Sequence, residues 1–242
     1  SNDMLPLPIY RNEIEIESDL GLDEDQAKLT SLYTDEALTF LADHLSETPD
    51  EPFFLYMAHT FPHQPYFASE SFEGRSEGGA YGDTVEEVDW SIGEITAFLE
   101  RHDIEEDTLF LFMSDNGPWY EGSASELRGR KGQSFEGGFR VPLIAWWPGR
   151  IPAGKIIEEP AMNIDILPTV FALGGVSLPT DRIIDGMDIS PVLFEPSFSL
   201  PRRPLYYYHY DRLESVRFGD WKYYPRVSRY TWPIPLDAAS VP

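Results

Sequence analysis

The sequence predicts an α/β fold, in which helices alternate with strands, followed by a small antiparallel sheet near the C-terminal end. Two segments, residues 23–47 and 84–101, repeat apolar side chains at three- and four-residue steps, the period of an amphipathic helix. Short apolar runs bounded by turn residues, as buried strands are, occupy residues 53–58, 108–113 and 141–147. Together these patterns predict a parallel α/β core.

The two helical segments have recognisable ends. Pro49 and Pro52 stop the first, because proline removes a backbone donor and restricts the residue before it. Thr84 begins the second, with Glu87 three residues later, a pattern that resembles a capping box. Residues 163–173 predict a further helix, and residues 1–22, Pro-rich and then acidic, predict a surface connector.

The sequence pattern changes after about residue 200, from alternating helices and strands to short strands alone. Short aromatic-rich segments at 205–208, 214–218 and 221–224 predict antiparallel strands, with Gly219-Asp220 as a hairpin turn. We therefore predict an α/β domain over residues 1–200. The start of a small antiparallel subdomain follows at 201–242.

Composition excludes several classes of partner and chemistry. The 242 residues carry 18 Lys and Arg against 42 Asp and Glu, a net charge of −24, which argues against binding to nucleic acid or to anionic membranes. There is no cysteine, so this chain holds no disulfide, thiolate nucleophile or Cys-ligated zinc. No apolar run approaches the ~20 residues that span a bilayer, and no signal peptide is found.

The most informative segment is residues 114–118, Ser-Asp-Asn-Gly-Pro, directly after the apolar run 108–113. Ligand sites in open α/β sheets lie at the ends of strands, and Asp115 and Asn116 would place two oxygen donors there. Hard oxygen donors suit Ca²⁺ or Mg²⁺ better than a soft transition metal. The alternative is that Asp-Asn-Gly-Pro is ordinary turn chemistry.

A histidine follows another predicted strand. His59 and His63 are four residues apart, like a zinc pair on a helix, but Pro62 and Pro65 argue against a continuous helix, so we reject that metal site. A loop histidine at a strand end donates a hydrogen bond to an anion or to a leaving group. The alternative for His63 is a structural or solvated side chain.

Residues 128–142 form a Gly-rich segment with four basic residues in an otherwise acidic protein. Lys131 there would neutralise charge on a transferring oxyanion group. The alternative is a solvated basic loop, and for Arg140 we favour a structural ion pair. Trp119 and Tyr120, next to the Asp-Asn turn, either stack on a sugar or aryl ring or pack the loop.

The order of these motifs resembles that of the type I sulfatases, most of all arylsulfatase A and the N-acetylgalactosamine-6-sulfatases. The resemblance covers about residues 52–221. Its motifs are the 53–58 segment, His63, residues 81–83, 114–118, 131–132, 135–142, 146–149, 165–169 and 185–186.

This resemblance implies an alkaline-phosphatase-like α/β fold and hydrolysis of a sulfate ester at one bound Ca²⁺. By position, Asp115 and Asn116 match two metal ligands, while His63 and Lys131 match residues that contact the sulfate and act in catalysis. Dinuclear phosphatases of the same superfamily tend to have His at the Asn116 position. Asn116 therefore favours the single-cation sulfatase.

One feature departs from the family. Sulfatases use a formylglycine made from Cys or Ser in a Cys/Ser-x-Pro-x-Arg motif near the N-terminus. Residues 199–203 fit these letters but follow all the other motifs, so we interpret them as a chance match. The N-terminal aspartate pair of the family also has no counterpart. We expect the formylglycine in a missing N-terminal part, and we expect the isolated chain to be inactive.

The expected function is a sulfatase acting on a sulfated carbohydrate or an aryl sulfate, in a secreted, periplasmic or lysosomal setting. Two alternatives stay open: a phosphodiesterase or phosphonate hydrolase of the same superfamily, and a non-catalytic remnant. The residues specify no oligomeric state, no sulfate position, and neither exo nor endo action.

Overall fold

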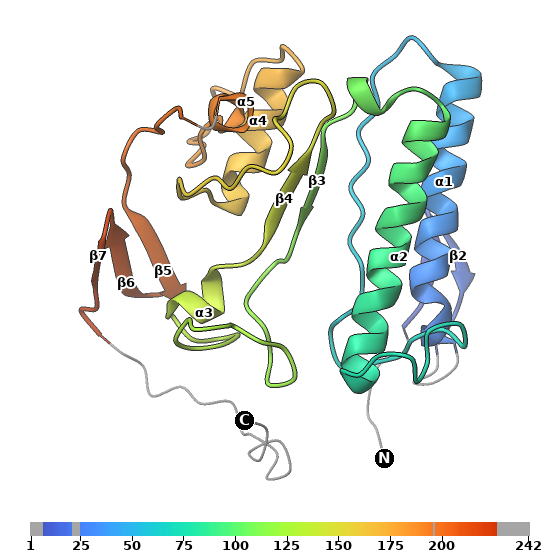
Figure 1. Cartoon of the computed structure of the whole chain (residues 1–242), viewed down its shortest axis with the longest axis horizontal. Helices are drawn as coiled ribbons and strands as arrows, with labels where there is room; N and C mark the ends of the chain where they lie inside the picture. Colours follow the sequence, from blue (N-terminus) through green and yellow to red (C-terminus); the bar gives the residue numbers. More distant parts are fainter. Residues whose placement is uncertain (1–6, 21–24, 196, 227–242) are drawn as a thin grey trace. The chain divides into compact units, whose positions relative to one another are not determined.

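The structure, a computed structural model, describes residues 7–20, 25–195 and 197–226. The chain divides into two compact units, residues 1–104 and 105–242, and each is described by itself (Figure 1). The predicted division near residue 200 stays a prediction.

The first unit begins with a hairpin. Strands β1 (Ile9–Arg11) and β2 (Ile14–Glu17) pair antiparallel, and Asn12 in the turn has a positive φ of 55°. These residues lie on the surface, as predicted, but they form a hairpin and not an irregular connector. The ends of the predicted connector, residues 1–6 and 21–22, lie outside the described residues. The alternation of Ile and Glu along β2 has the two-residue period of a strand.

Two long helices form the core of this unit. α1 (Leu29–Glu47) follows a short 3-10 turn at Gln26–Lys28 and packs beside α2 (Gly79–Arg101), as Figure 1 shows. The interface between the two helices contains a buried pair of hydroxyl groups, Thr34 Oγ1 and Ser91 Oγ, which lie 2.6 Å apart. Both predicted helices are confirmed, and residues 23–24 of the first lie outside the described residues. The buried apolar side chains are Leu29, Ala37 and Leu41 of α1 and Val88, Ile95, Phe98 and Leu99 of α2.

α2 begins five residues before the predicted start, so the predicted capping box is wrong. The Thr84 hydroxyl lies inside the helix and donates to the carbonyl of Tyr81 at 2.8 Å. The preceding loop is held instead by the buried carboxylate of Asp83, which accepts the backbone N–H groups of Gly74 at 2.9 Å and Ser76 at 2.8 Å. These hydrogen bonds lower the pKa of Asp83.

Residues 53–58 form neither a helix nor a strand, which corrects the predicted buried strand. Their side chains alternate between half-buried and exposed, and Phe54 and Tyr56 are 68% and 80% exposed. An apolar run predicts burial, but a strand also requires a neighbouring backbone to pair with. No such pairing exists within the described part of the chain.

The second unit contains the strand that leads to the Asp-Asn turn. β3 (Phe110–Met113) pairs antiparallel with β4 (Leu143–Trp146), with Phe110 opposite Trp146. Both strands are confirmed, but the predicted burial is wrong for β4, where Leu143 and Ile144 are 38% and 57% exposed. The predicted parallel pairing is wrong for both strands. The connection holds one four-residue helix, α3 (Glu136–Phe139), and not the long crossover helix that parallel pairing uses.

A helical segment with a buried carboxylate follows. The predicted helix is confirmed as a 3-10 turn (Asn163–Asp165) and α4 (Ile166–Leu173); a further short helix, α5 (Ser190–Phe194), was not predicted. Asp165 has 0% exposure. It accepts the backbone N–H groups of Met162 at 2.7 Å and Met187 at 3.0 Å.

Arg203 completes the environment of Asp165. Its guanidinium forms two hydrogen bonds to the carboxylate, from Nη1 to Oδ1 at 2.7 Å and from Nη2 to Oδ2. Leu200 is buried in a small apolar core with Ile189 and Val192. Residues 199–203 thus have a structural role, which supports their interpretation as a chance match to the formylglycine motif.

The C-terminal sheet is confirmed. β5 (Leu205–His209), β6 (Arg212–Phe218) and β7 (Trp221–Tyr223) form an antiparallel sheet in that order. Gly219, with φ +57°, lies in the predicted hairpin turn.

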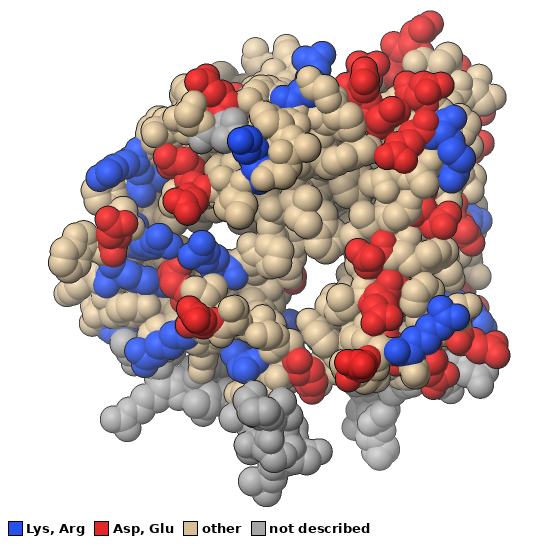
Figure 2. Space-filling view, viewed as in Figure 1, with Lys and Arg blue, Asp and Glu red and all other residues tan. Residues whose placement is uncertain are grey.

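Charge is distributed unevenly along the chain. Residues 1–104 carry 4 Lys and Arg against 24 Asp and Glu, whereas residues 105–242 carry 14 against 18. Figure 2 shows acidic side chains spread over α1 and α2. Within the described ranges, no helix is long and apolar enough to cross a membrane.

Candidate functional site

The Asp-Asn turn begins where β3 ends. Asp115 is exposed and Asn116 is half-buried. Two hydrogen bonds fix their backbone: Ser114 Oγ donates to the Asn116 carbonyl at 3.0 Å, and the Gly117 N–H donates to the Gly138 carbonyl at 3.0 Å. The turn therefore presents a carboxylate and an amide on a tethered backbone.

Lys131 lies on a second loop that contacts this turn. Its backbone N–H donates to the Pro118 carbonyl at 3.0 Å. The structure thus brings three of the four predicted site residues, Asp115, Asn116 and Lys131, onto two directly bonded loops of one unit. His63 belongs to the other unit, where it is exposed and its Nδ1 lies 2.7 Å from the Gln64 carbonyl.

Glycines allow the loops to approach this closely. A Cβ added to Gly117 would lie 2.0 Å from the carbonyl oxygen of Gly137. A Cβ added to Gly137 would lie 2.1 Å from the carbonyl oxygen of Gly129. A Cβ added to Gly138 would lie 2.2 Å from the Gln133 oxygen. Because these contacts are to backbone atoms, no side-chain rotation relieves them, and the site geometry requires glycine here.

We predict that Gly137→Ala destabilises the protein by about 1–3 kcal/mol, because the new methyl group overpacks a backbone contact. Gly93→Ala is the matched control: Gly93 lies inside α2 with nothing within 4 Å of an added Cβ. There alanine is expected to stabilise by about 0.5–1 kcal/mol through the helix propensity of the two residues. Urea denaturation measures both changes, and equal effects would contradict the packing argument.

Arg130 holds the aromatic part of the loop. Its Nη1 donates to the carbonyls of Trp119 at 2.9 Å and Gly122 at 2.7 Å, and its guanidinium lies 5.5 Å from the centre of the Tyr120 ring. The rings of Trp119 and Tyr120 contact each other edge to face at 4.7 Å. These contacts support loop packing rather than a free stacking platform.

The other basic residues of the loop differ in their partners. The Arg128 guanidinium lies 4.0 Å from the centre of the Phe135 ring. Arg140 is exposed and forms no ion pair with a described carboxylate, so the predicted ion pair is not observed. Lys131 is half-buried as a residue, and its ammonium likewise has no hydrogen-bond or ion-pair partner among the described residues, which leaves it available to an anion.

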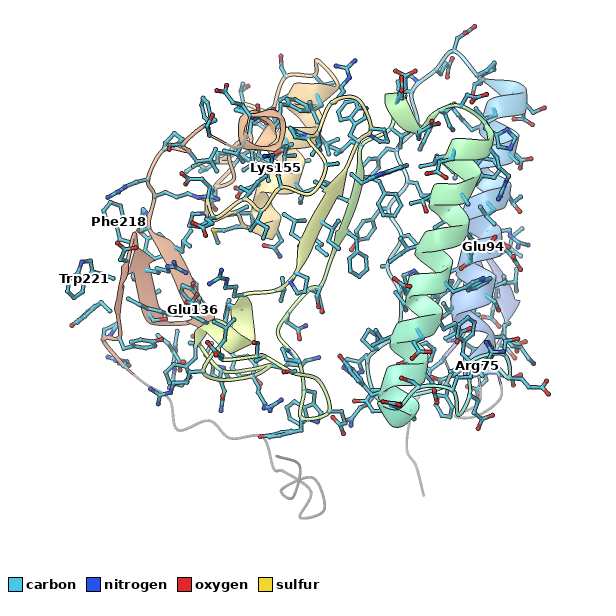
Figure 3. All side chains as sticks on the ribbon, viewed as in Figure 1. Arg75, Glu94, Glu136, Lys155, Phe218 and Trp221 are labelled. Atoms are coloured by element: carbon cyan, nitrogen blue, oxygen red, sulfur yellow. The ribbon has the colours of Figure 1, made fainter. Side chains whose placement is uncertain are left out.

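A polar cluster surrounds Glu136, the first residue of α3, which Figure 3 labels beside the C-terminal sheet. Its Oε1 accepts from the Tyr207 hydroxyl at 2.9 Å and from Lys222 Nζ at 2.8 Å. Its Oε2 accepts from Arg217 Nη1 at 2.9 Å. Sequence analysis missed this cluster, because the three donors lie 71 to 86 residues after Glu136 in the chain.

The cluster changes the pKa of its members. Burial acts to raise the pKa of Glu136, but the hydrogen bonds from Lys222 and Tyr207 and the two positive charges outweigh burial and lower it. Burial first, and then the Glu136 charge, raise the pKa of the Tyr207 hydroxyl. Glu136 is therefore ionised and Tyr207 protonated at neutral pH.

We predict an acid-dependent loss of this stabilisation. A carboxyl group whose pKa is lower in the folded state stabilises above its unfolded pKa of about 4.3, and the contribution is lost as pH falls through the folded value. Glu136→Gln should therefore be less stable than the unmodified protein at pH 7, with a difference that shrinks below about pH 4. Thermal denaturation across this range tests it, and a difference independent of pH would contradict it.

The donors in the Asp-Asn turn fit a calcium site in part. Asp115 and Asn116 supply two of the six to eight oxygen ligands that Ca²⁺ takes. In the described residues, no group of three or more His, Cys, Asp or Glu side chains is placed to hold a metal ion. The turn by itself could therefore supply only one side of a cation site.

Comparison with known proteins shows the family. The family model named Sulfatase matches residues 9–176, more than half of the chain. The chain belongs to the sulfatase family. A second model, described as N-sulphoglucosamine sulphohydrolase, C-terminal, matches residues 130–230. The predicted family is confirmed.

Curated proteins with a similar sequence are also sulfatases. The chain is 39% identical to an N-acetylgalactosamine-6-sulfatase of Canis lupus familiaris over 227 residues, which cover 89% of this chain and 43% of the relative. It is 43% identical to an arylsulfatase of Hemicentrotus pulcherrimus over 206 residues, covering 83% and 36%. The chain thus spans less than half the length of these relatives.

Among solved structures, the sulfatase PsFucS1 from Pseudoalteromonas sp. superposes with a TM-score of 0.81 at 31% identity, covering 87% of this chain and 43% of that one. The neighbouring sulfatase structures confirm the predicted alkaline-phosphatase-like fold class with a small antiparallel C-terminal sheet.

Proposed function

We propose that this chain is part of a hydrolase that cleaves sulfate esters. In it, Asp115 and Asn116 bind one calcium ion, and Lys131 and His63 contact the sulfate. One observation carries the proposal: in a sulfatase-family chain, the hydrogen bond from the Lys131 N–H to the Pro118 carbonyl joins the lysine loop to the Asp-Asn turn.

Each residue has a role that its chemistry suits. The bound calcium ion would supply positive charge to the sulfate oxygens. Lys131 would neutralise further charge that develops on these oxygens, and its ammonium has no competing partner in the described region. His63 would donate a proton to the leaving oxygen. The nucleophile, a formylglycine in this family, would come from protein sequence outside this chain.

The substrate class follows from the relatives. Among them are proteins named N-acetylgalactosamine-6-sulfatase, arylsulfatase and steryl-sulfatase. We propose a sulfated carbohydrate or an aryl sulfate as substrate, and a secreted, periplasmic or lysosomal setting. The net charge of −24 repels such an anion at long range, so the proposed calcium ion and basic residues would have to attract it locally.

The competing phosphonate or phosphodiester activity has less support. A phosphonate monoester hydrolase from Silicibacter pomeroyi shares the fold at 18% identity, with a TM-score of 0.54, and this likeness shows the fold alone. Asn116 supplies a neutral oxygen donor where a two-metal enzyme would use a nitrogen ligand for zinc. The turn therefore favours a single hard cation.

The test compares sulfate and phosphate esters with the full-length protein. We predict turnover of 4-nitrophenyl sulfate that a chelator removes and added Ca²⁺ restores. Asp115→Asn should lower kcat/KM by roughly 10²–10³-fold, because the weakened cation site stabilises less charge. Asp107→Asn is the matched control, since Asp107 is an exposed aspartate of the same unit.

Other outcomes would separate the alternatives. Faster turnover of phosphate or phosphonate esters would support the competing hydrolase. Calcium binding without turnover of any ester would support a non-catalytic remnant.

A further inference from the structure

We infer that Glu136 is a positioning residue. Through α3, it ties the C-terminal sheet to the two loops that carry Asp115, Asn116 and Lys131. The tie itself is a property of the second unit, and only its consequence for catalysis rests on the proposed function.

The first step is the attachment of Glu136 to the sheet. Each strand contributes one donor: Tyr207 from β5, Arg217 from β6 and Lys222 from β7. The Lys222 ammonium also lies 3.2 Å from the centre of the Tyr207 ring, so these two donors contact each other. One carboxylate therefore joins all three strands to the start of α3.

Further contacts place the sheet against the same short segment. Ser215 Oγ donates to the carbonyl of Ser134 at 3.2 Å, just before α3. The ring of Phe139, at the end of α3, lies 4.9 Å from the ring of Tyr207. The sheet thus contacts the segment 134–139 at three places: Ser134 before α3, Glu136 at the start of α3 and Phe139 at its end.

The second step runs from α3 to the site loops through backbone contacts. The Gly138 carbonyl accepts the Gly117 N–H at 3.0 Å, and the Gly137 N–H donates to the Arg128 carbonyl at 2.8 Å. An added Cβ at Gly138 would lie 2.6 Å from the Arg130 carbonyl, next to Lys131. With backbones in contact, a displacement of α3 moves both loops, because close-packed atoms leave no slack.

The third step is the charge of Glu136. Its two oxygens accept three donors, two of them cationic, and such charge-assisted bonds are stronger than neutral ones. A glutamine would turn an N–H₂ group toward one of these donors. Glu136→Gln therefore keeps the size of the side chain while it breaks at least one bond to the sheet.

The test is amide hydrogen exchange of the full-length protein, resolved to Gly117, Lys131 and Gly138. In Glu136→Gln we expect exchange at these amides to be at least ten-fold faster. Glu126→Gln is the matched control, because it makes the same charge change at an exposed residue of the neighbouring loop. Unchanged protection of these amides in Glu136→Gln, or an equal change in Glu126→Gln, would overturn the inference.

A second variant covers the case in which Glu136→Gln does not fold. Lys222→Gln removes a single donor, and we expect about three-fold faster exchange at the same three amides while α2 amides keep their protection. Faster exchange throughout the protein would show a general loss of stability and would overturn the positioning role.

The consequence for the site has its own readout. If the proposed function holds, Glu136→Gln raises the dissociation constant for Ca²⁺ and lowers kcat more than it raises KM. Absence of sulfatase activity in the unmodified protein overturns the proposed function and leaves the exchange result intact. Normal activity and calcium affinity in Glu136→Gln, with unchanged exchange, overturns the inference alone.

Discussion

Replacing Asp165 with alanine is expected to destabilise the protein by about 3–5 kcal/mol, the largest stability change we predict. The carboxylate is fully buried and is bound by both outer nitrogens of Arg203, whose side chain is only 16% exposed. Without Asp165, a guanidinium and two backbone N–H groups, of Met162 and Met187, lose their acceptor away from water. Urea denaturation of the full-length protein measures the loss.

Asp181→Ala is the matched control. Asp181 also pairs with an arginine, Arg182, but both side chains are 66% exposed. Solvent screens such a pair, so the expected loss is below about 1 kcal/mol. Similar losses for Asp165→Ala and Asp181→Ala would contradict the argument from burial.

A double variant separates an unpaired charge from an unfilled space. Asp165→Leu with Arg203→Met replaces the ion pair by apolar side chains, and buried pairs replaced in this way often retain stability. We therefore expect the double variant to be more stable than Asp165→Ala alone. A double variant that is no more stable would show that the two backbone hydrogen bonds outweigh the ion pair.

Asp165 also shows where sequence analysis succeeds and where it fails. The sequence predicts the helix that Asp165 begins, because periodicity is a local property of the chain. It does not predict the partner, since Arg203 lies 38 residues away and its segment matches an unrelated motif by letters. Local periodicity likewise predicts α1, β3 and the C-terminal sheet.

Pairing between strands is the part of the fold that is hardest to predict from sequence. The apolar runs at 53–58 and at β3 read alike in sequence, yet only β3 has a partner strand in the described structure. The direction of the β3–β4 pair was also predicted incorrectly, because side-chain patterns report burial and not backbone direction. Pairing depends on which neighbour offers free N–H and C=O groups.

The candidate site likewise has a part that the sequence predicts and a part that it does not. Local motifs indicate Asp115, Asn116 and Lys131, and the structure joins their loops. The backbone contact that brings Gly117 against Gly137 has no local signal beyond the glycines themselves. The Glu136 cluster has even less local sequence signal, because its donors come from three strands far along the chain.

Lys131→Met is expected to lower kcat/KM for 4-nitrophenyl sulfate by roughly 10²–10³-fold in the full-length protein, with little change in the urea midpoint. The two effects separate because the Lys131 backbone N–H, which holds the loop to Pro118, survives the substitution. In the described structure the ammonium itself contributes no ion pair to stability. Methionine keeps most of the length of the side chain, so the variant removes the charge and little else.

Lys155→Met provides the control, because Lys155 is an exposed lysine of the same unit and makes the same charge change. Its kcat/KM should stay within about two-fold of the unmodified value, since a solvent-screened charge outside the site adds little to the transition state. If both variants lose activity equally, the effect belongs to net charge, and Lys131 is the solvated loop residue of the alternative hypothesis. A loss confined to Lys131→Met requires its ammonium to act on the sulfate itself, because the fold and the total charge are then the same in both variants.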